Sequence, residues 1–143
     1  VEPEVLMDGD HDIDRCYEVT QRVLNKTFQE LRVQRVELEG MVLKPNMAIS
    51  GKKCARQASV AEVAEKTVRM LKACVPAAVP GIAFLSGGQS DEEATALIAA
   101  AHSSTRADFR ALRWLNVRCM FGSFLRVSVL SEAKARTRVR HGI

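Results

Sequence analysis

The sequence predicts an α/β fold with a parallel sheet, and two observations lead to this prediction. Short apolar runs alternate along the chain with longer stretches whose apolar residues recur every three or four positions, an order typical of βαβ units. The run GIAFL at 81–85 is apolar throughout, as expected for a strand that is buried on both faces. With 143 residues, of which 47% are hydrophobic and 27% charged, the chain has the composition of a globular domain.

The elements are predicted from local signals taken in chain order. Ser59 with Glu62 and Ser90 with Glu93 are capping boxes, each of which marks the start of a helix. Apolar residues at helical spacing predict the longest helix. Beyond residue 101 the pattern is weaker. The predicted ranges are strands at 1–6, 36–44, 81–85 and 114–121, and helices at 11–34, 60–74, 90–101 and 123–136.

Charge divides the chain into two parts. Residues 1–101 hold 12 Lys and Arg against 15 Asp and Glu, whereas residues 102–143 hold 9 against 2. We therefore predict a main segment at 1–101 and a basic tail at 102–143 that covers a last strand and helix. The tail lacks the interleaved aromatic residues of a base-stacking surface, which argues against a nucleic-acid partner.

No metal site, membrane span or secretory leader is predicted. The acidic start, without Met or a signal-peptide pattern, suggests the middle of a longer protein, and no apolar run is long enough to span a bilayer. Asp8, Asp10 and Asp12 resemble the start of a calcium loop, but Ile13 and Val19 stand where Gly and Glu are required. The cysteines have no C-x-x-C spacing; reduced thiols are the favoured interpretation, and disulfides remain the alternative. They are Cys16, Cys54, Cys74 and Cys119.

Lys44 ends the apolar run Met41-Val42-Leu43, and Pro45 follows it directly. An exposed lysine at a strand end is the simpler interpretation, and spacing alone favours it. The alternative is a nucleophile, because an amine in apolar surroundings is poorly solvated as a cation, which lowers its pKa. The neutral amine can attack a carbonyl and form a Schiff base.

Glu2 and Glu4 lie two positions apart in the first predicted strand, so their side chains are expected on one face. Two carboxylates that repel each other suit general acid/base catalysis, because one of them is then more easily protonated. Imine formation needs such a group, since water must leave the carbinolamine. An exposed acidic edge is the alternative, and spacing alone favours it.

The turn that contains Ser86, Gly87 and Gly88 joins a predicted strand to a predicted helix. Free backbone N–H groups at such a turn can bind an anion. The turn is not a Walker loop, because no Lys-Ser/Thr pair follows it. An ordinary connecting loop is the alternative.

Three stretches together resemble class I fructose-bisphosphate aldolase, the Schiff-base type. They are VEPEVLMDGDHDI at 1–13, LEGMVLKPNM at 38–47 and GIAFLSGGQSDEEAT at 81–95, in the order and at the spacing of the family. The resemblance implies a (β/α)8 TIM barrel, of which this chain supplies roughly strands five to eight. It also implies a homo-oligomer, usually a tetramer, in the cytoplasm or a plastid.

The activity implied is reversible cleavage of fructose 1,6-bisphosphate to dihydroxyacetone phosphate and glyceraldehyde 3-phosphate. Lys44 matches the imine-forming lysine, Glu2 the main general acid/base, and Glu4 the second carboxylate beside the lysine. Ser86 and Gly87, with Gly88 beside them, match the site that binds a substrate phosphate. No cofactor is needed, because the protonated imine is itself the electron sink.

Two departures from the family accompany the resemblance. A complete barrel needs about 250 residues, so the chain is expected to be a fragment that is inactive, or nearly so, alone. In FGSFL at 121–125, Ser123 stands where the family carries a phosphate-binding arginine. The alternative function is therefore a non-catalytic aldolase-like module whose basic tail contacts an anionic partner.

Overall fold

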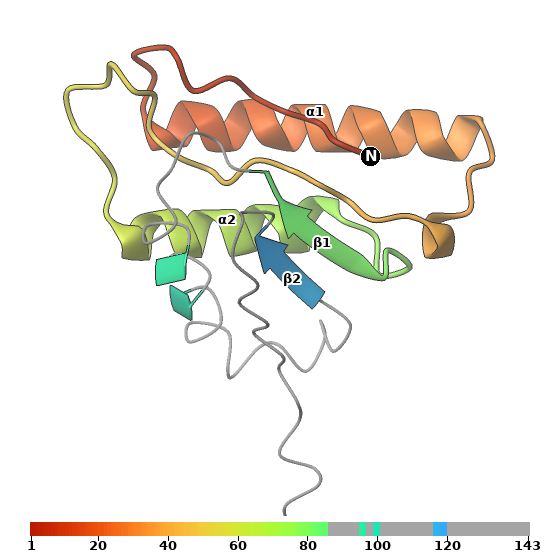
Figure 1. Ribbon diagram of the computed structural model, residues 1–143. Coiled ribbons are helices and arrows are strands. Elements are labelled where there is room, and N and C mark those ends of the chain that lie inside the picture. Colours follow the sequence, from red (N-terminus) through yellow and green to blue (C-terminus); the bar gives the residue numbers. More distant parts are fainter. Residues whose placement is uncertain (86–94, 97–98, 101–115, 120–143) are drawn as a thin grey trace, which may run out of the picture.

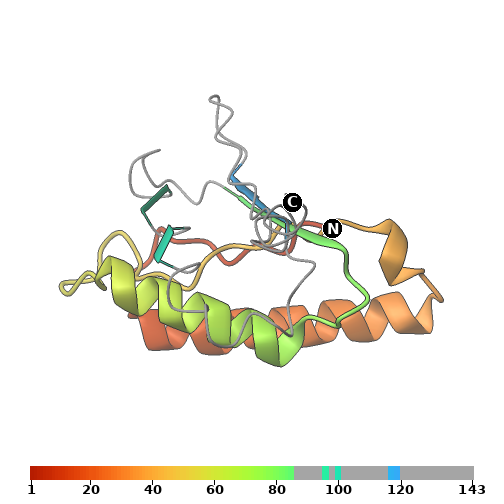
Figure 2. The ribbon, with the colours of Figure 1, turned by 90° about the horizontal axis from the view of Figure 1, so that it is seen from below.

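The computed structural model describes residues 1–85, 95–96, 99–100 and 116–119. These ranges contain two long helices, one short 3-10 helix and two short strands. They are α1 (Ile13–Val33), η1 (Leu38–Gly40), α2 (Val60–Cys74), β1 (Gly81–Phe84) and β2 (Asn116–Cys119). The two long helices lie side by side on one side of the strands (Figures 1 and 2).

Helix α1 forms because its start and its apolar spacing are both encoded locally. The Asp12 side chain accepts a hydrogen bond from the Arg15 N–H at 2.8 Å and so caps the first turn. Its buried positions recur at three- or four-residue spacing and face α2 and the shared core. The predicted helix at 11–34 is confirmed to within two residues at its start. The buried positions are Ile13, Cys16, Thr20, Leu24 and Phe28.

Helix α2 starts at the predicted capping box. The Ser59 side chain accepts from the Glu62 N–H, and the Glu62 carboxylate accepts from the Ser59 N–H at 2.8 Å, so two free backbone donors are satisfied. The helix ends at Cys74, shortly before Pro76. The predicted range of 60–74 is confirmed.

The described strands run parallel, as the sequence predicts. β1 pairs with β2 in the register Gly81 to Asn116 and Phe84 to Cys119, and β2 lies within the predicted strand at 114–121. On the other side of β1, Leu43 forms a parallel bridge with Ile82. The segment that contains Leu43 in turn bonds to Val1. Four chain segments therefore lie side by side and run in the same direction: the first residues, the segment around Leu43, β1 and β2.

Two predicted strands are only partly realised. Residues 38–40 of the predicted strand at 36–44 form η1 instead, because the Gly40 and Met41 N–H groups bond back to Glu37 and Leu38 at 3.3 Å. Within the predicted range 36–44, extended pairing with β1 begins only after η1 and is limited to the bridge between Leu43 and Ile82. In the predicted strand at 1–6, backbone pairing is confined to Val1.

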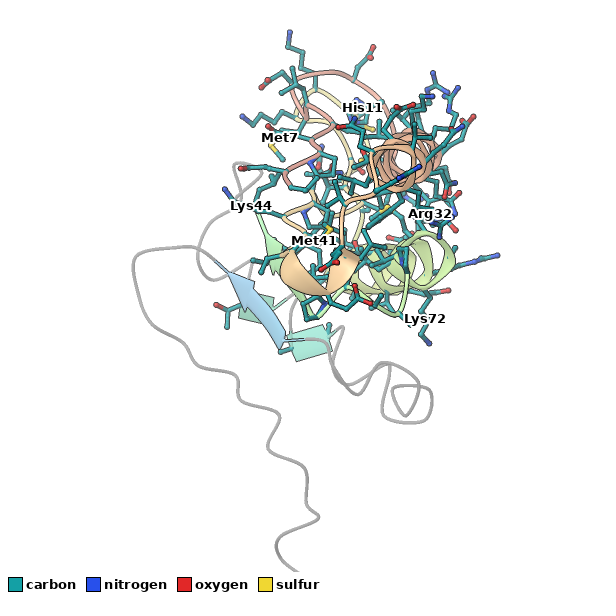
Figure 3. The ribbon with its side chains drawn as sticks, turned by 90° about the vertical axis from the view of Figure 1, so that its right-hand side faces the viewer. Met7, His11, Arg32, Met41, Lys44 and Lys72 are labelled. Atoms are coloured by element: carbon teal, nitrogen blue, oxygen red, sulfur yellow. The ribbon has the colours of Figure 1, made fainter. Side chains whose placement is uncertain are left out.

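The sheet has two chemically different sides. Leu43, Ile82 and Phe84 are between 0% and 3% exposed and pack into the core with the helices. Val42 and Lys44, the neighbours of Leu43, point to the other side and are more exposed, as the alternation of side chains along a strand requires. Figure 3 shows Lys44 near the carboxyl end of β1 and on the side away from Arg32 and Lys72 of the two helices.

The remaining predictions concern ranges that the structure describes only in part. Residues 95–96 and 99–100 are helical and fall within the predicted helix at 90–101. The predicted helix at 123–136 lies outside the described residues, and the division at residue 101 remains a prediction. Within the described ranges, no helix combines the length and apolar character that a membrane span requires.

Candidate functional site

Lys44 is held at the carboxyl end of a strand-like segment by backbone bonds on both sides. Next to it, the Leu43 N–H donates to the Gly81 carbonyl at 3.1 Å, and the Leu43 carbonyl accepts from Ala83 at 2.9 Å. Leu43 is fully buried, so its side chain anchors the segment in the core. Lys44 therefore projects from a fixed backbone to the side of the sheet opposite the helices.

Glu2 is brought to Lys44 by the pairing of the first residues with this segment. The Val1 nitrogen donates to the Val42 carbonyl at 2.9 Å, and the Lys44 N–H donates to the Val1 carbonyl at 2.8 Å. This is the bonding pattern of parallel strands, and it places residue 2 beside residue 44. The Lys44 Nζ donates to the Glu2 Oε1 at 2.6 Å.

The surroundings of this pair leave it accessible to a ligand. The Lys44 side chain is 29% exposed and the Glu2 side chain 51% exposed. An amine and a carboxylate at this distance can exchange a proton directly. The pair thus has the two groups that imine chemistry needs, a nucleophile and a proton acceptor, on an open side of the sheet.

Glu4 is not part of this contact. Its side chain is exposed, and no ion pair joins it to another described residue. Glu4 lies two residues beyond Glu2, a distance of about 7 Å along an extended chain. The predicted proximity of the carboxylates to the lysine is therefore seen for Glu2, whereas the role of Glu4 remains a prediction.

The predicted phosphate-binding residues Ser86, Gly87 and Gly88 lie outside the described residues, as does Ser123. Their roles remain predictions. The chain reaches this turn from β1 and Leu85, whose N–H donates to the Pro45 carbonyl at 3.2 Å. Leu85, the last described residue before the turn, therefore lies beside Pro45, which follows Lys44.

Among the described residues, Asp8, Asp12, Cys16 and Cys74 take part in local structure away from the pair of Lys44 and Glu2. Asp12 caps α1, and Asp8 pairs with Lys52 at 3.4 Å. Among the described residues, no group of three or more His, Cys, Asp or Glu side chains could hold a metal ion. Cys16 and Cys74 are buried free thiols, and burial raises the pKa of both.

Asn46 is a buried residue near the site that sequence reasoning missed. Its side chain is hydrogen-bonded to the first segment and to α1. The available signal was a strongly polar residue inside the otherwise apolar stretch that follows Lys44. Such a residue is found in a core only where its amide groups have partners.

Comparison with known proteins identifies the family. The family described as "Fructose-bisphosphate aldolase class-I" matches residues 1–138. A Xanthomonas campestris protein described as "Probable fructose-bisphosphate aldolase class 1" is 64% identical over 96 residues, which are 67% of this chain and 29% of that protein. A Xylella fastidiosa protein of the same description is 52% identical over 114 residues, 80% of this chain and 33% of that protein.

A solved structure supports the same assignment. Fructose-bisphosphate aldolase from Plasmodium falciparum superposes with a TM-score of 0.75 at 42% identity, over 83% of this chain and 33% of that chain. The described strands and helices therefore have the fold of part of a TIM barrel. The chain belongs to the class I fructose-bisphosphate aldolase family. It spans about a third of the length of these relatives.

Proposed function

We infer that this chain carries the imine-forming part of a class I fructose-bisphosphate aldolase site. The observation that carries the proposal is the 2.6 Å contact between the Lys44 Nζ and the Glu2 Oε1 at the carboxyl end of the sheet. Active sites of (β/α)8 barrels lie at this end. The two residues also match the family's lysine and its main general acid/base.

In the proposed reaction, Lys44 attacks the ketone carbonyl of fructose 1,6-bisphosphate as a neutral amine. Glu2 takes up the proton that the amine releases and returns a proton when the carbinolamine hydroxyl leaves as water. Glu2, again a carboxylate, then takes up the proton of the substrate hydroxyl beside the breaking carbon–carbon bond. The electron pair of that bond enters the protonated imine to give an enamine, and glyceraldehyde 3-phosphate departs as the aldehyde. Protonation and hydrolysis of the remaining enamine release dihydroxyacetone phosphate and regenerate Lys44.

Other parts of the proposal rest on the resemblance to the family. Glu4 is the second carboxylate, and the backbone at Ser86, Gly87 and Gly88 binds a substrate phosphate. No cofactor takes part. The protein is a homotetramer in the cytoplasm, with a plastid as the alternative compartment.

The test is borohydride reduction in the presence of dihydroxyacetone phosphate, followed by peptide mass mapping. We expect an adduct on Lys44 and none on Lys52, an exposed lysine that is ion-paired with Asp8. Lys44→Arg should abolish the adduct, because a guanidinium does not form the imine, whereas Lys52→Arg should leave it unchanged. An unmodified Lys44 in a folded sample would reject the proposal and favour the non-catalytic module.

A further inference from the structure

The Asn46 side chain connects three separate segments of the chain. It is only 3% exposed. Its Oδ1 accepts a hydrogen bond from the Val5 N–H at 3.0 Å, and its Nδ2 donates to the Thr20 Oγ1 and to the Met47 carbonyl, both at 3.0 Å. The amide therefore joins the segment of Glu2 to helix α1 and to the segment of Lys44.

The orientation of this amide is fixed by its partners. The Val5 N–H can only donate and the Met47 carbonyl can only accept. The oxygen of Asn46 must therefore face Val5, and its nitrogen must face Met47. Thr20, which receives the second hydrogen of that nitrogen, is 1% exposed.

Pro3 explains why a side chain is needed at this place. In a parallel pair that starts with Val1 beside Leu43, the next donor from the first segment would be the nitrogen of residue 3. Residue 3 is proline, which has no N–H. The next donor is Val5, and it bonds to the side-chain oxygen of Asn46.

We propose that Asn46 is a positioning residue that holds Glu2 in register with Lys44. This inference rests on the proposed function, because it assigns Glu2 to the imine chemistry of Lys44. The backbone bonds of Val1 fix one end of the first segment, and the bond between Val5 and Asn46 fixes the other. Glu2 lies between these two points, and Asn46 touches neither the reacting amine nor the carboxylate.

The first experiment is a double-mutant cycle on the rate of borohydride trapping with dihydroxyacetone phosphate, in the full chain that carries residues 1–143. Asn46→Ala should lower the trapping rate by about 10- to 100-fold, the scale expected when a reacting group is misplaced. In a Glu2→Gln background, the same change should lower the rate by less than about twofold. Equal losses in both backgrounds, or no loss in either, would overturn the inference.

Thr20→Val is the second variant, and Thr27→Val is its matched control. Thr20→Val removes one partner of the Asn46 amide without changing side-chain size and should slow trapping in the same direction as Asn46→Ala. Thr27 lies on the same helix, but its hydroxyl bonds to the Val23 carbonyl, so Thr27→Val should leave the rate unchanged. Equal effects of the two valine variants on the trapping rate would contradict the proposal. This comparison remains decisive even where Asn46→Ala fails to fold.

Amide hydrogen exchange separates this inference from the proposed function. In Asn46→Ala, which removes the acceptor of the Val5 N–H, the Val5 amide should exchange faster than in Thr27→Val, by up to about tenfold. In Thr20→Val, which removes a partner of the Asn46 nitrogen but keeps this acceptor, the increase should be smaller. Unchanged exchange would overturn the register claim. Failure of the unmodified chain to form an imine would instead reject the proposed function, and Val5 exchange would still decide whether Asn46 sets the register.

Discussion

The Lys44 Nζ lies 2.6 Å from the Glu2 Oε1, although the two residues are 42 positions apart. Their contact follows from the parallel pairing of Val1 with the segment around Leu43. Both side chains are partly exposed, and such ion pairs contribute only about 0.2–1 kcal/mol to stability. The pair therefore contributes little to the stability of the fold, and its proposed role in proton transfer is tested by replacement of Glu2.

Replacement of Glu2 by glutamine should slow imine trapping at Lys44 by at least about 100-fold, because the amide keeps the size of the side chain but cannot take up the proton. The measurement is the rate of adduct formation with dihydroxyacetone phosphate and borohydride. Glu18→Gln is the control, since Glu18 is an exposed carboxylate paired with Arg15 on α1, and it should have no effect. A Glu2→Gln protein that reacts at the original rate would remove Glu2 from the mechanism.

The helices could be predicted from sequence because their determinants are local. Ser59 and Glu62 lie three positions apart, and the bonds they form are those of a capping box. The strand that leads to Lys44 is harder to predict, because η1 depends on how the chain returns from the end of α1 to the sheet. Gly40 and Met41 use their N–H groups in that turn, and no local signal separates this from an extended strand.

The candidate site could be predicted only in part. The distance from Glu2 to Lys44 depends on strand register, which spacing within the sequence does not reveal. The expectation that the two side chains lie together therefore comes from the resemblance to the family. The role of Asn46 could not be foreseen, because its partners Val5 and Thr20 come from two segments distant in sequence. A buried asparagine becomes informative only when those segments have been placed.

Leu24→Ala should destabilise the fold by about 2–5 kcal/mol, because Leu24 is fully buried between α1 and the rest of the core and its truncation leaves a cavity. Urea unfolding followed by circular dichroism measures the loss. Val33→Ala is the control on the same helix. Val33 is 70% exposed, and its truncation should change the free energy of unfolding by less than about 0.5 kcal/mol. Similar losses in the two variants would mean that α1 does not pack as described.

Glu62 should make the stability of α2 sensitive to acid. The hydrogen bond from the Ser59 backbone, then that from the Ser59 side chain, and the charge of Arg56 lower the pKa of Glu62 below its ordinary value of 4.5. Because the folded-state pKa is the lower one, the stabilisation is present above pH 4.5 and is lost as the pH falls through the folded-state value. The difference in urea midpoint between the unmodified chain and Glu62→Gln should therefore shrink below pH 4.5.

Glu65→Gln serves as the control for this acid titration, because Glu65 is exposed on the same helix. Glu65 takes no part in the capping box of Ser59 and Glu62, so Glu65→Gln should change the urea midpoint at neutral pH less than Glu62→Gln does. A Glu62→Gln difference that stays constant through the acid range would show that the capping carboxylate does not control this part of the pH dependence.

Arg35→Gly should stabilise the end of α1. Arg35 has a φ of 56°, a left-handed conformation that costs about 1–2 kcal/mol for a residue with a Cβ. The conformation is required, because the Arg35 N–H bonds to the Arg32 carbonyl at 3.0 Å and the Val36 N–H bonds to the Leu31 carbonyl at 2.9 Å, the pattern of a Schellman cap, in which glycine is the preferred residue.

The gain should be about 1 kcal/mol in urea unfolding, since part of the relief is offset by the greater freedom of glycine in the unfolded chain. Arg32→Gly, three residues earlier and inside the helix, is the matched control. It should destabilise the fold by about 1 kcal/mol, because glycine there has no strain to relieve. If both glycine variants lost stability, the left-handed cap at Arg35 would be rejected; opposite signs at the two positions would establish it.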